Sequence, residues 1–126
     1  MTGALLGFGI DSVDILRFAQ VLARRPGLAS RLFTPGEQHY AAGLANPVPS
    51  LAARFAAKEA VMKALGVGLG AFEWVDVEVT RADSGAPSLV VSGRAATLAA
   101  DRGITGWHLS LTHTDTVASA LVAAVA

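Results

Sequence analysis

Two carboxylates occupy positions where the surrounding pattern is apolar, which makes them the first candidates for chemistry. Asp11 ends a glycine-interrupted apolar run that starts at Leu5. On a helix, Glu59 would lie at the centre of a stripe of apolar and small residues, formed by Ala52, Phe55, Ala56, Met62 and Gly66. An ionised carboxylate in an apolar place is unfavourable by several kcal/mol unless it is compensated, so Glu59 requires a basic partner or a cation.

The cation that suits these carboxylates is a hard one. The chain contains no cysteine, so any metal must be bound by oxygen or imidazole ligands. Magnesium commonly takes one or two carboxylates together with substrate phosphates, which points to phosphoryl chemistry. Each carboxylate also has an ordinary interpretation. Asp11 or Ser12 would suit the N-cap of a following helix, and Lys63, one turn after Glu59, could be no more than an ion-pair partner.

The spacing of apolar residues predicts the elements that position these side chains. A buried strand over 5–10 leads into an amphipathic helix near 12–25. The strongest helix is predicted over 51–65, with Ser50 as its N-cap and Gly66 as the glycine that ends it. One carboxylate is therefore expected at the end of a strand and the other inside a helix.

The remaining elements complete a single α+β domain over residues 1–126. They are a short helix from the Thr34–Glu37 capping motif to about Leu44, strands over 75–79 and 88–91, a helix over 93–102, and strands over 107–111 and 117–125. The predicted order is β-α-α-α-β-β-α-β-β. Runs of strands and helices that do not alternate are typical of α+β folds.

Charge and composition exclude several classes of protein. Ten basic and ten acidic side chains give a formal net charge of +0, which argues against binding to nucleic acid through many phosphate contacts. No run of apolar residues approaches the roughly 20 that a membrane-spanning helix needs, so no membrane partner is expected. The N-terminal segment lacks the basic start of a signal peptide, and we expect a cytoplasmic protein.

Two motifs resemble those of the holo-[acyl-carrier-protein] synthases, the short trimeric type within the 4'-phosphopantetheinyl transferase family. Residues 7–11 read Gly-Phe-Gly-Ile-Asp and are followed by Arg17, as in the N-terminal motif of that family. Residues 54–60 read Arg-Phe-Ala-Ala-Lys-Glu-Ala and, with Lys63, resemble its signature helix. Further segments follow in the family's order, at 66–70, 76–79, 85–87 and 109–114. The resemblance spans nearly the whole chain.

This resemblance implies a fold in which an antiparallel sheet packs against a long helix. It also implies that Asp11 and Glu59 bind Mg²⁺, which bridges to the diphosphate of coenzyme A. The catalytic residues would be Asp11, Glu59 and Lys63. Coenzyme A would be held by Arg54, Lys63, Gly66 and His113. The family is typically a homotrimer with sites between protomers, so some of these contacts would cross a subunit boundary.

A basic patch on the first predicted helix is the expected surface for a protein partner. Arg17 and Arg24 are seven residues apart and so share one face, while Arg25 and Arg31 lie nearby. On pattern alone these arginines could be an ordinary solvated face. The resemblance implies that Arg17, Val21 and Arg24 bind the acidic helix of an apo acyl carrier protein, where arginine would pair with carboxylates in bidentate fashion.

The implied reaction transfers 4'-phosphopantetheine from coenzyme A to a serine of the apo carrier, giving holo-acyl carrier protein and adenosine 3',5'-bisphosphate. The carrier would serve fatty-acid or polyketide synthesis. Two other functions fit the residues. One is a non-catalytic oligomeric binding module in which Glu59 is only paired to Lys63. The other is a magnesium-dependent phosphotransferase that uses a different nucleotide.

Overall fold

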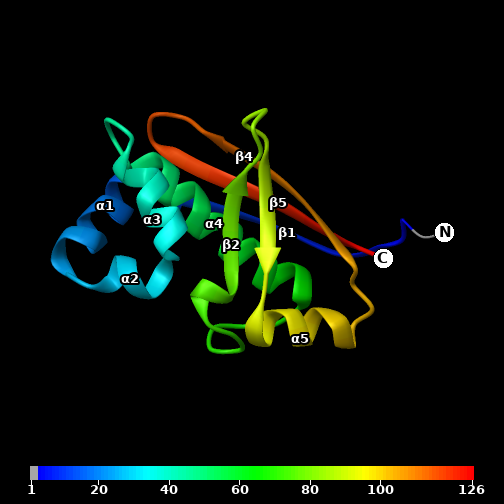
Figure 1. Cartoon of the computed structure of the whole chain (residues 1–126). Coiled ribbons are helices and arrows are strands. Elements are labelled where there is room, and N and C mark those ends of the chain that lie inside the picture. The colour runs from blue at the N-terminus through cyan, green and yellow to red at the C-terminus, as the bar shows by residue number, and fades with distance from the viewer. Residues whose placement is uncertain (1–2) are drawn as a thin grey trace.

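The elements of the chain are described by a computed structural model over residues 3–126; residues 1–2 of the predicted domain and N-terminal segment lie outside the described part. In order they are β1 (Leu5–Asp14), α1 (Ile15–Arg24), α2 (Leu28–Leu32), α3 (Pro35–Ala42), α4 (Val48–Leu65), η1 (Trp74–Asp76), β2 (Val77–Arg81), β3 (Pro87–Val91), α5 (Gly93–Asp101), β4 (Gly106–His113) and β5 (Val117–Val125). The α+β class and the predicted order are confirmed, with the short α2 and η1 as additions (Figure 1).

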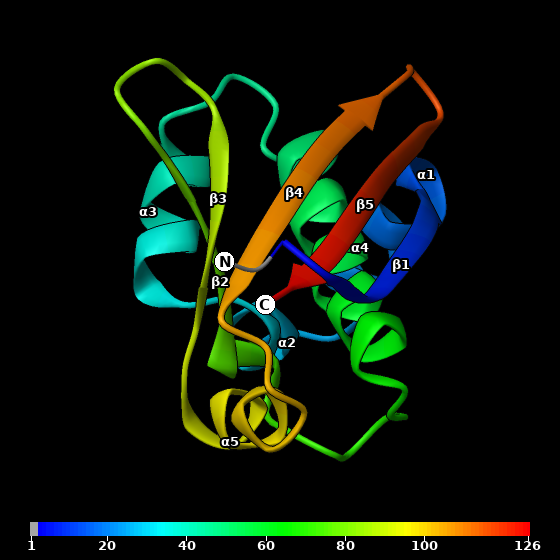
Figure 2. The same ribbon diagram turned by 90° about the vertical axis from the view of Figure 1, so that its right-hand side faces the viewer.

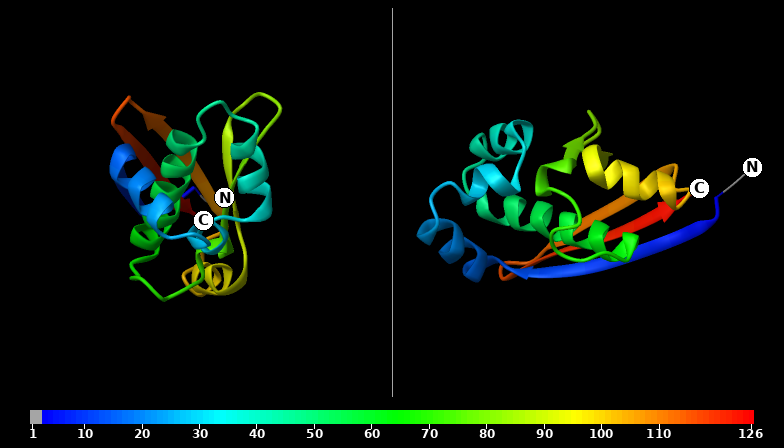
Figure 3. Two further views of the ribbon diagram at one scale, coloured as in Figure 1. Left: turned by 90° about the vertical axis from the view of Figure 1, so that its left-hand side faces the viewer. Right: turned by 90° about the horizontal axis from the view of Figure 1, so that it is seen from below.

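A three-stranded antiparallel sheet in the order β1-β5-β4 packs against the long helix α4, while β2 and β3 form a separate antiparallel pair. Helix α4 lies along β1 and β5 on one face of this sheet (Figure 2). Helices α1, α2 and α3 gather at one end of the molecule and the described chain ends lie at the other (Figure 3). The expected antiparallel sheet against a long helix is therefore present.

Strand β1 continues past the point where the sequence predicted a helix cap. Residues 11–14 remain paired with 117–120 of β5, and the hydroxyls of Ser12 and Ser119 lie 2.8 Å apart. Asp14, not Asp11 or Ser12, caps α1 by accepting the N–H of Arg17 at 2.8 Å. The cap prediction was wrong because pairing with a central strand outweighs the local capping preference. Asp11 is left on the strand, with its carboxylate free for another role.

Two glycines allow β1 to pass unusually close to α4. A Cβ atom at Gly7 would overlap the carbonyl oxygen of Ala64, and one at Gly9 would overlap that of Ala60. Alternate residues of a strand share a face, so Gly7, Gly9 and Asp11 all point toward the helix. These two glycines thus permit the close approach of a strand to a helix. This contact carries Asp11 to the surface of α4.

Helix α4 begins three residues earlier than predicted. Its first residue is Val48, whose N–H donates to the side-chain oxygen of Asn46 at 3.2 Å. Pro49 follows in the first turn, where proline is tolerated because no N–H is needed for a helical hydrogen bond. The predicted N-cap Ser50 lies inside the helix, where its hydroxyl accepts from the guanidinium of Arg54. At the other end Gly66 closes the helix as predicted, in the left-handed conformation with φ 71°.

The segment before β2 differs from the predicted strand over 75–79. Residues 74–76 form η1, and the strand runs over 77–81. The carboxylate of Asp76 explains the change, because it accepts from the N–H of Glu73 at 3.3 Å and from that of Arg94, at the start of α5, at 3.0 Å. The aspartate thus ties a turn to a helix start.

Two clusters of buried apolar residues lie along α4. One fills the space between α4, the sheet, β2 and α5, and α4 contributes small residues such as Ala56 and Ala60 that are fully buried. The other joins α1, α2 and α4 through aromatic rings, with Phe18 and Phe55 stacked at 5.2 Å between centroids. Among the described residues, none of the helices has both the length and the apolarity to cross a bilayer.

Candidate active site

The structure brings together three of the predicted site residues where β1 meets α4. Strand β1 presents Asp11, and α4 presents Glu59 and Lys63 one turn apart. The ammonium of Lys63 donates to a carboxylate oxygen of Asp11 at 3.0 Å and to the backbone carbonyl of Ile10 at 2.8 Å. Lys63 is thus ion-paired with Asp11, and within the described residues no ion pair joins it to Glu59. Asp11 is mostly buried, while about half of the Lys63 side chain remains exposed.

Glu59 is the group that this arrangement perturbs most. Burial raises the pKa of Glu59 to about 7, and a hydrogen bond with Asp11 and the negative charge of that carboxylate add to the effect. The positive charge of Lys63 acts in the opposite direction. Two carboxylates therefore share a half-buried site with a single ammonium, an arrangement that a further cation would relieve.

The donor set fits magnesium. Within residues 3–126 no group of three or more histidine, cysteine, aspartate or glutamate side chains lies close enough to hold a metal ion. The Asp11 and Glu59 pair would therefore supply two carboxylates and leave the other positions to water or phosphate. Magnesium is commonly bound in this way beside a substrate phosphate.

A second charged site lies on the other side of α4, in a pocket of about 270 Å³. Arg54 lines this pocket, is 1% exposed, and has an Nε with no hydrogen-bond partner among the described residues. Burial lowers the pKa of Arg54 from its usual range, against the opposing charge of Glu37. The buried guanidinium is thus short of negative charge, which makes the pocket attractive to an anion.

His113 lines the same pocket from the end of β4, with Nδ1 3.2 Å from the carbonyl oxygen of Thr114. The pocket also contains two residues that the sequence analysis did not assign. The guanidinium carbons of Arg54 and Arg81 lie 4.5 Å and 5.5 Å from the ring centroid of Tyr40. Arg81 is the last residue of β2 and lies between the recognised segments 76–79 and 85–87 without belonging to either, so no motif marked it.

The two charged sites are separate within one chain. Asp11 lies on β1 and His113 at the end of β4, which are the two edge strands of the three-stranded sheet. Neither Asp11, Glu59 nor Lys63 lines the Arg54 pocket. The structure therefore brings the predicted metal ligands together, and brings Arg54 and His113 together, but does not join these two groups.

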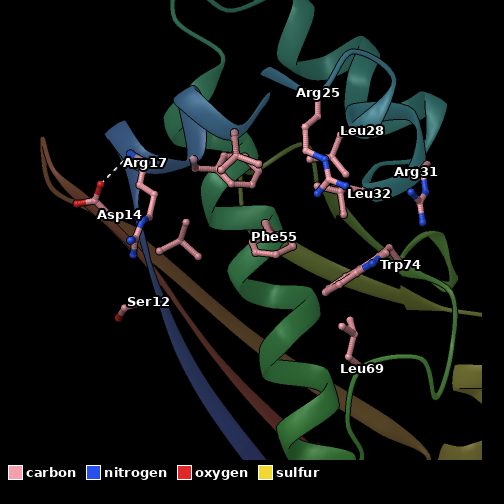
Figure 4. Close-up of a pocket in the computed structure, with 13 residues that line it drawn as sticks. Ser12, Asp14, Arg17, Arg25, Leu28, Arg31, Leu32, Phe55, Leu69 and Trp74 are labelled. Atoms are coloured by element: carbon pink, nitrogen blue, oxygen red, sulfur yellow. Dashed lines mark hydrogen bonds between the residues drawn. The ribbon is translucent and has the colours of Figure 1, made fainter. Parts of the chain in front are cut away.

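A larger pocket than that of Arg54, about 670 Å³, lies between α1, α2 and α4. Figure 4 shows its apolar side, formed by Phe55, Leu69 and Trp74, and the arginines that surround it. The basic residues that line it are Arg17, Arg25 and Arg31, and the predicted carrier contact Val21 lines it as well. Arg24 is not among the lining residues. The basic patch is thus shifted toward the C-terminal end of α1 and toward α2.

Comparisons with known proteins agree with this arrangement. The sequence model of the 4'-phosphopantetheinyl transferase superfamily matches residues 7–124. A holo-[acyl-carrier-protein] synthase of Frankia alni is 54% identical over 121 residues, 96% of this chain and 98% of the relative.

Solved structures match over nearly the full length. The holo-[acyl-carrier-protein] synthase of Neisseria meningitidis has a TM-score of 0.87 at 29% identity, covering 96% of this chain and 98% of that one. The corresponding synthase of Bacillus anthracis, in complex with CoA (3',5'-ADP), has a TM-score of 0.81 at 31% identity, covering 100% and 99%. The chain therefore belongs to the 4'-phosphopantetheinyl transferase superfamily and, within it, to the holo-[acyl-carrier-protein] synthase enzymes.

Proposed function

We propose that this chain transfers 4'-phosphopantetheine from coenzyme A to a serine of an apo acyl carrier protein and releases adenosine 3',5'-bisphosphate. The observation that carries the proposal is the half-buried centre of Asp11, Glu59 and Lys63, built from the two motifs that mark the family. A related synthase binds CoA (3',5'-ADP), which supports coenzyme A as the donor.

Asp11 and Glu59 are proposed to hold Mg²⁺, since they supply two neighbouring oxygen ligands and excess negative charge. When bound, the ion neutralises charge on the diphosphate of coenzyme A. Lys63 keeps its ammonium at the same place, half-exposed and within reach of a phosphate oxygen that enters the centre.

The proposed transfer consists of attack by the carrier serine, removal of its proton and stabilisation of the charge that develops. The serine oxygen of the carrier attacks the phosphorus attached to pantetheine, and the bond from that phosphorus to the bisphosphate oxygen breaks. The proton of the serine hydroxyl passes to Glu59 or to a water that Asp11 or Glu59 orients, since these are the bases of the centre. The ammonium of Lys63 stabilises the negative charge that develops on the phosphate oxygens.

The Arg54 pocket is proposed to bind a phosphate of coenzyme A, with His113 and Arg81 beside it. Because this pocket and the Asp11 centre lie on opposite sides of α4, a complete site would combine the centre of one protomer with the pocket of its neighbour. The outward face of the sheet supports such assembly. Phe8 and Ile10 point away from α4 and are 62% and 60% exposed, a large apolar surface for a monomer. A homotrimer is the proposed state.

The large pocket is proposed to dock the acyl carrier protein. Its apolar side could receive a hydrophobic residue of the carrier, while Arg17, Arg25 and Arg31 would pair with acidic residues around it. The pocket begins next to Asp11, because Ser12 and Val13 line its edge. A carrier bound there would present its serine close to the proposed metal centre.

Mass spectrometry of an apo carrier protein tests the proposal directly. After incubation with the enzyme, coenzyme A and Mg²⁺, the carrier should gain the mass of one phosphopantetheine, and adenosine 3',5'-bisphosphate should appear. An unmodified carrier would favour a non-catalytic binding module. Transfer from a different nucleotide in a parallel panel would favour the phosphotransferase alternative.

A further inference from the structure

Lys58 belongs to the signature helix but takes no part in the centre formed by its neighbour Glu59. Its side chain is fully buried, so it is out of reach of a substrate. The ammonium donates to Glu37 at 2.8 Å, to the carbonyl oxygen of Trp74 at 3.1 Å and to that of Val77. An ammonium has three N–H donors, and here each has an acceptor.

Glu37, the anionic half of this pair, is equally buried and extends the network to two more elements. One carboxylate oxygen accepts from the N–H of Thr34 at 3.0 Å, before α3, and the other accepts from that of Val79 at 2.9 Å, in β2. Burying two charges is unfavourable, and a well-packed apolar pair is often at least as stable. A role in fixing one arrangement of the chain explains such a pair better than a gain in stability.

What Lys58 fixes is the turn that carries Trp74. The indole of Trp74 packs against Phe55, with ring centroids 5.1 Å apart, and both residues form the apolar side of the large pocket in Figure 4. Phe55 in turn stacks on Phe18, which lines the same pocket. The ammonium of Lys58 thus lies behind the pocket and holds the main chain of one of its walls.

We propose that Lys58 is a positioning residue for the carrier-docking pocket. By binding the carbonyl groups of Trp74 and Val77, it keeps the indole of Trp74 against Phe55 and so preserves the apolar wall that meets the carrier. The inference rests on the proposed function of the pocket. It requires that loss of Lys58 weakens binding of the carrier and leaves binding of coenzyme A and Mg²⁺ unchanged, since the ammonium of Lys58 lies in neither the Asp11 centre nor the Arg54 pocket.

The test replaces the pair without leaving a buried charge alone. In the double variant Lys58→Met with Glu37→Gln, the glutamine oxygen can still accept a backbone N–H, while both main-chain carbonyls lose the ammonium. Val122→Ala serves as a control for stability, because Val122 is fully buried on β5 and is not one of the residues that line the pocket. All proteins carry Trp107→Phe, which leaves Trp74 as the only tryptophan of the chain.

We expect the KM for the apo carrier to rise roughly tenfold in the double variant. The kcat, the KM for coenzyme A and the Mg²⁺ requirement should stay near the parent values. The Trp74 emission should shift to longer wavelength, as an indole released toward water does. In the control, the melting temperature should fall while the carrier KM and the emission stay unchanged.

Three results would overturn the inference. One is an unchanged carrier KM in the folded double variant, and another is an equal loss in all kinetic parameters. The third is a double variant that does not fold, because the pair would then serve the fold and not the pocket. The emission of Trp74 is measured without any carrier. If the parent transfers nothing while the emission of the double variant still shifts, the proposed function fails and the role of Lys58 in positioning Trp74 stands.

Discussion

Among single residues, the partner of Lys63 decides the electrostatics of the proposed metal centre. Lys63 forms its ion pair with Asp11 and not with Glu59. Burial and the neighbouring carboxylate of Asp11 therefore leave Glu59 with a pKa of about 7. Glu59 is therefore largely protonated in the metal-free protein at slightly acidic pH. A cation at the centre must displace that proton, so metal binding and pH are linked.

This linkage predicts how stability changes with pH in the absence of metal. The folded protein binds a proton at Glu59 more tightly than the unfolded chain does, between pH about 4.5 and about 7. The contribution of Glu59 to the free energy of unfolding should therefore be largest below this window and fall as pH rises through it. A shift of this size in a fully buried group would correspond to about 3 kcal/mol, and solvent screening at half-buried Glu59 reduces the expected loss to about 1–2 kcal/mol.

Urea unfolding in EDTA at pH 5 and pH 8 measures this effect. Glu59→Gln, which mimics the protonated side chain, should lose the pH-dependent difference, and Mg²⁺ at pH 8 should restore stability to the parent but not to the variant. Asp83→Asn is the matched control, because Asp83 is an exposed carboxylate in the β2–β3 turn. If the parent and Glu59→Gln showed the same pH dependence, the perturbed carboxylate would have to be another residue.

A second prediction at this scale concerns Arg54, a buried cation whose charge disfavours the unliganded fold. Arg54→Met removes a guanidinium whose Nε has no partner within the described chain, so the melting temperature without ligand should rise by a few degrees. The affinity for coenzyme A should fall, roughly 30-fold or more by calorimetry. Arg94→Met, at an exposed position of α5, should change neither value. Unchanged coenzyme A affinity in Arg54→Met would remove the phosphate role of the pocket.

Among the elements, the contact of β1 with α4 is what builds the centre, and its glycines make it testable. A methyl group at Gly9 would meet the carbonyl of Ala60 and come within 2.8 Å of the Cβ of Lys63. Gly9→Ala should therefore lower the free energy of unfolding by about 1–3 kcal/mol, and transfer activity should fall with it as Asp11 moves away. Gly68→Ala is the control for stability, since nothing lies within 4 Å of the added Cβ. Denaturant unfolding of both variants gives the comparison.

The sequence anticipated these two elements for different reasons and with different accuracy. The period of apolar residues and the closing Gly66 predicted α4 to its last residue, because both signals are local. The same local reasoning placed a helix cap at Asp11 or Ser12, and failed because pairing of 11–14 with β5 is a contact between distant parts of the chain. The carboxylate pair itself was predicted from its motifs.

Other parts of the site had no local signal. Lys58 was part of a recognised motif, but its partners come from α3, from η1 and from the start of β2, so its burial follows only from the tertiary fold. Arg81 joins the Arg54 pocket for the same reason, through the ring of Tyr40. Arg25 replaces Arg24 at the large pocket because α1 ends there and the chain turns. Such contacts between distant segments cannot be deduced from spacing along one element.

For the whole molecule, the distribution of charge sites raises the question of how one coenzyme A can reach them all. Helix α4 separates the Asp11 centre from the Arg54 pocket, while the sheet exposes Ile10 beside Leu121 on its outward face. Burying that face between copies would cover apolar surface and could also bring the centre of one copy to the pocket of the next. In a closed ring, every interface would then hold one complete site.

A mixing experiment distinguishes sites shared between copies from sites within one chain. Glu59→Gln lacks the centre and Arg54→Met lacks the pocket, so each alone should transfer little phosphopantetheine. When the two are co-expressed in equal amounts, half of the copies carry an intact centre and half an intact pocket. About a quarter of the interfaces should then combine intact halves, and activity should return to about that fraction of the parent. Co-expression of Glu59→Gln with Asp11→Asn is the matched control, because both changes damage the same centre and no interface can be repaired. Equal, negligible activity in both mixtures would mean that each chain builds its site alone, and the exposed face of β1 and β5 would then need another explanation.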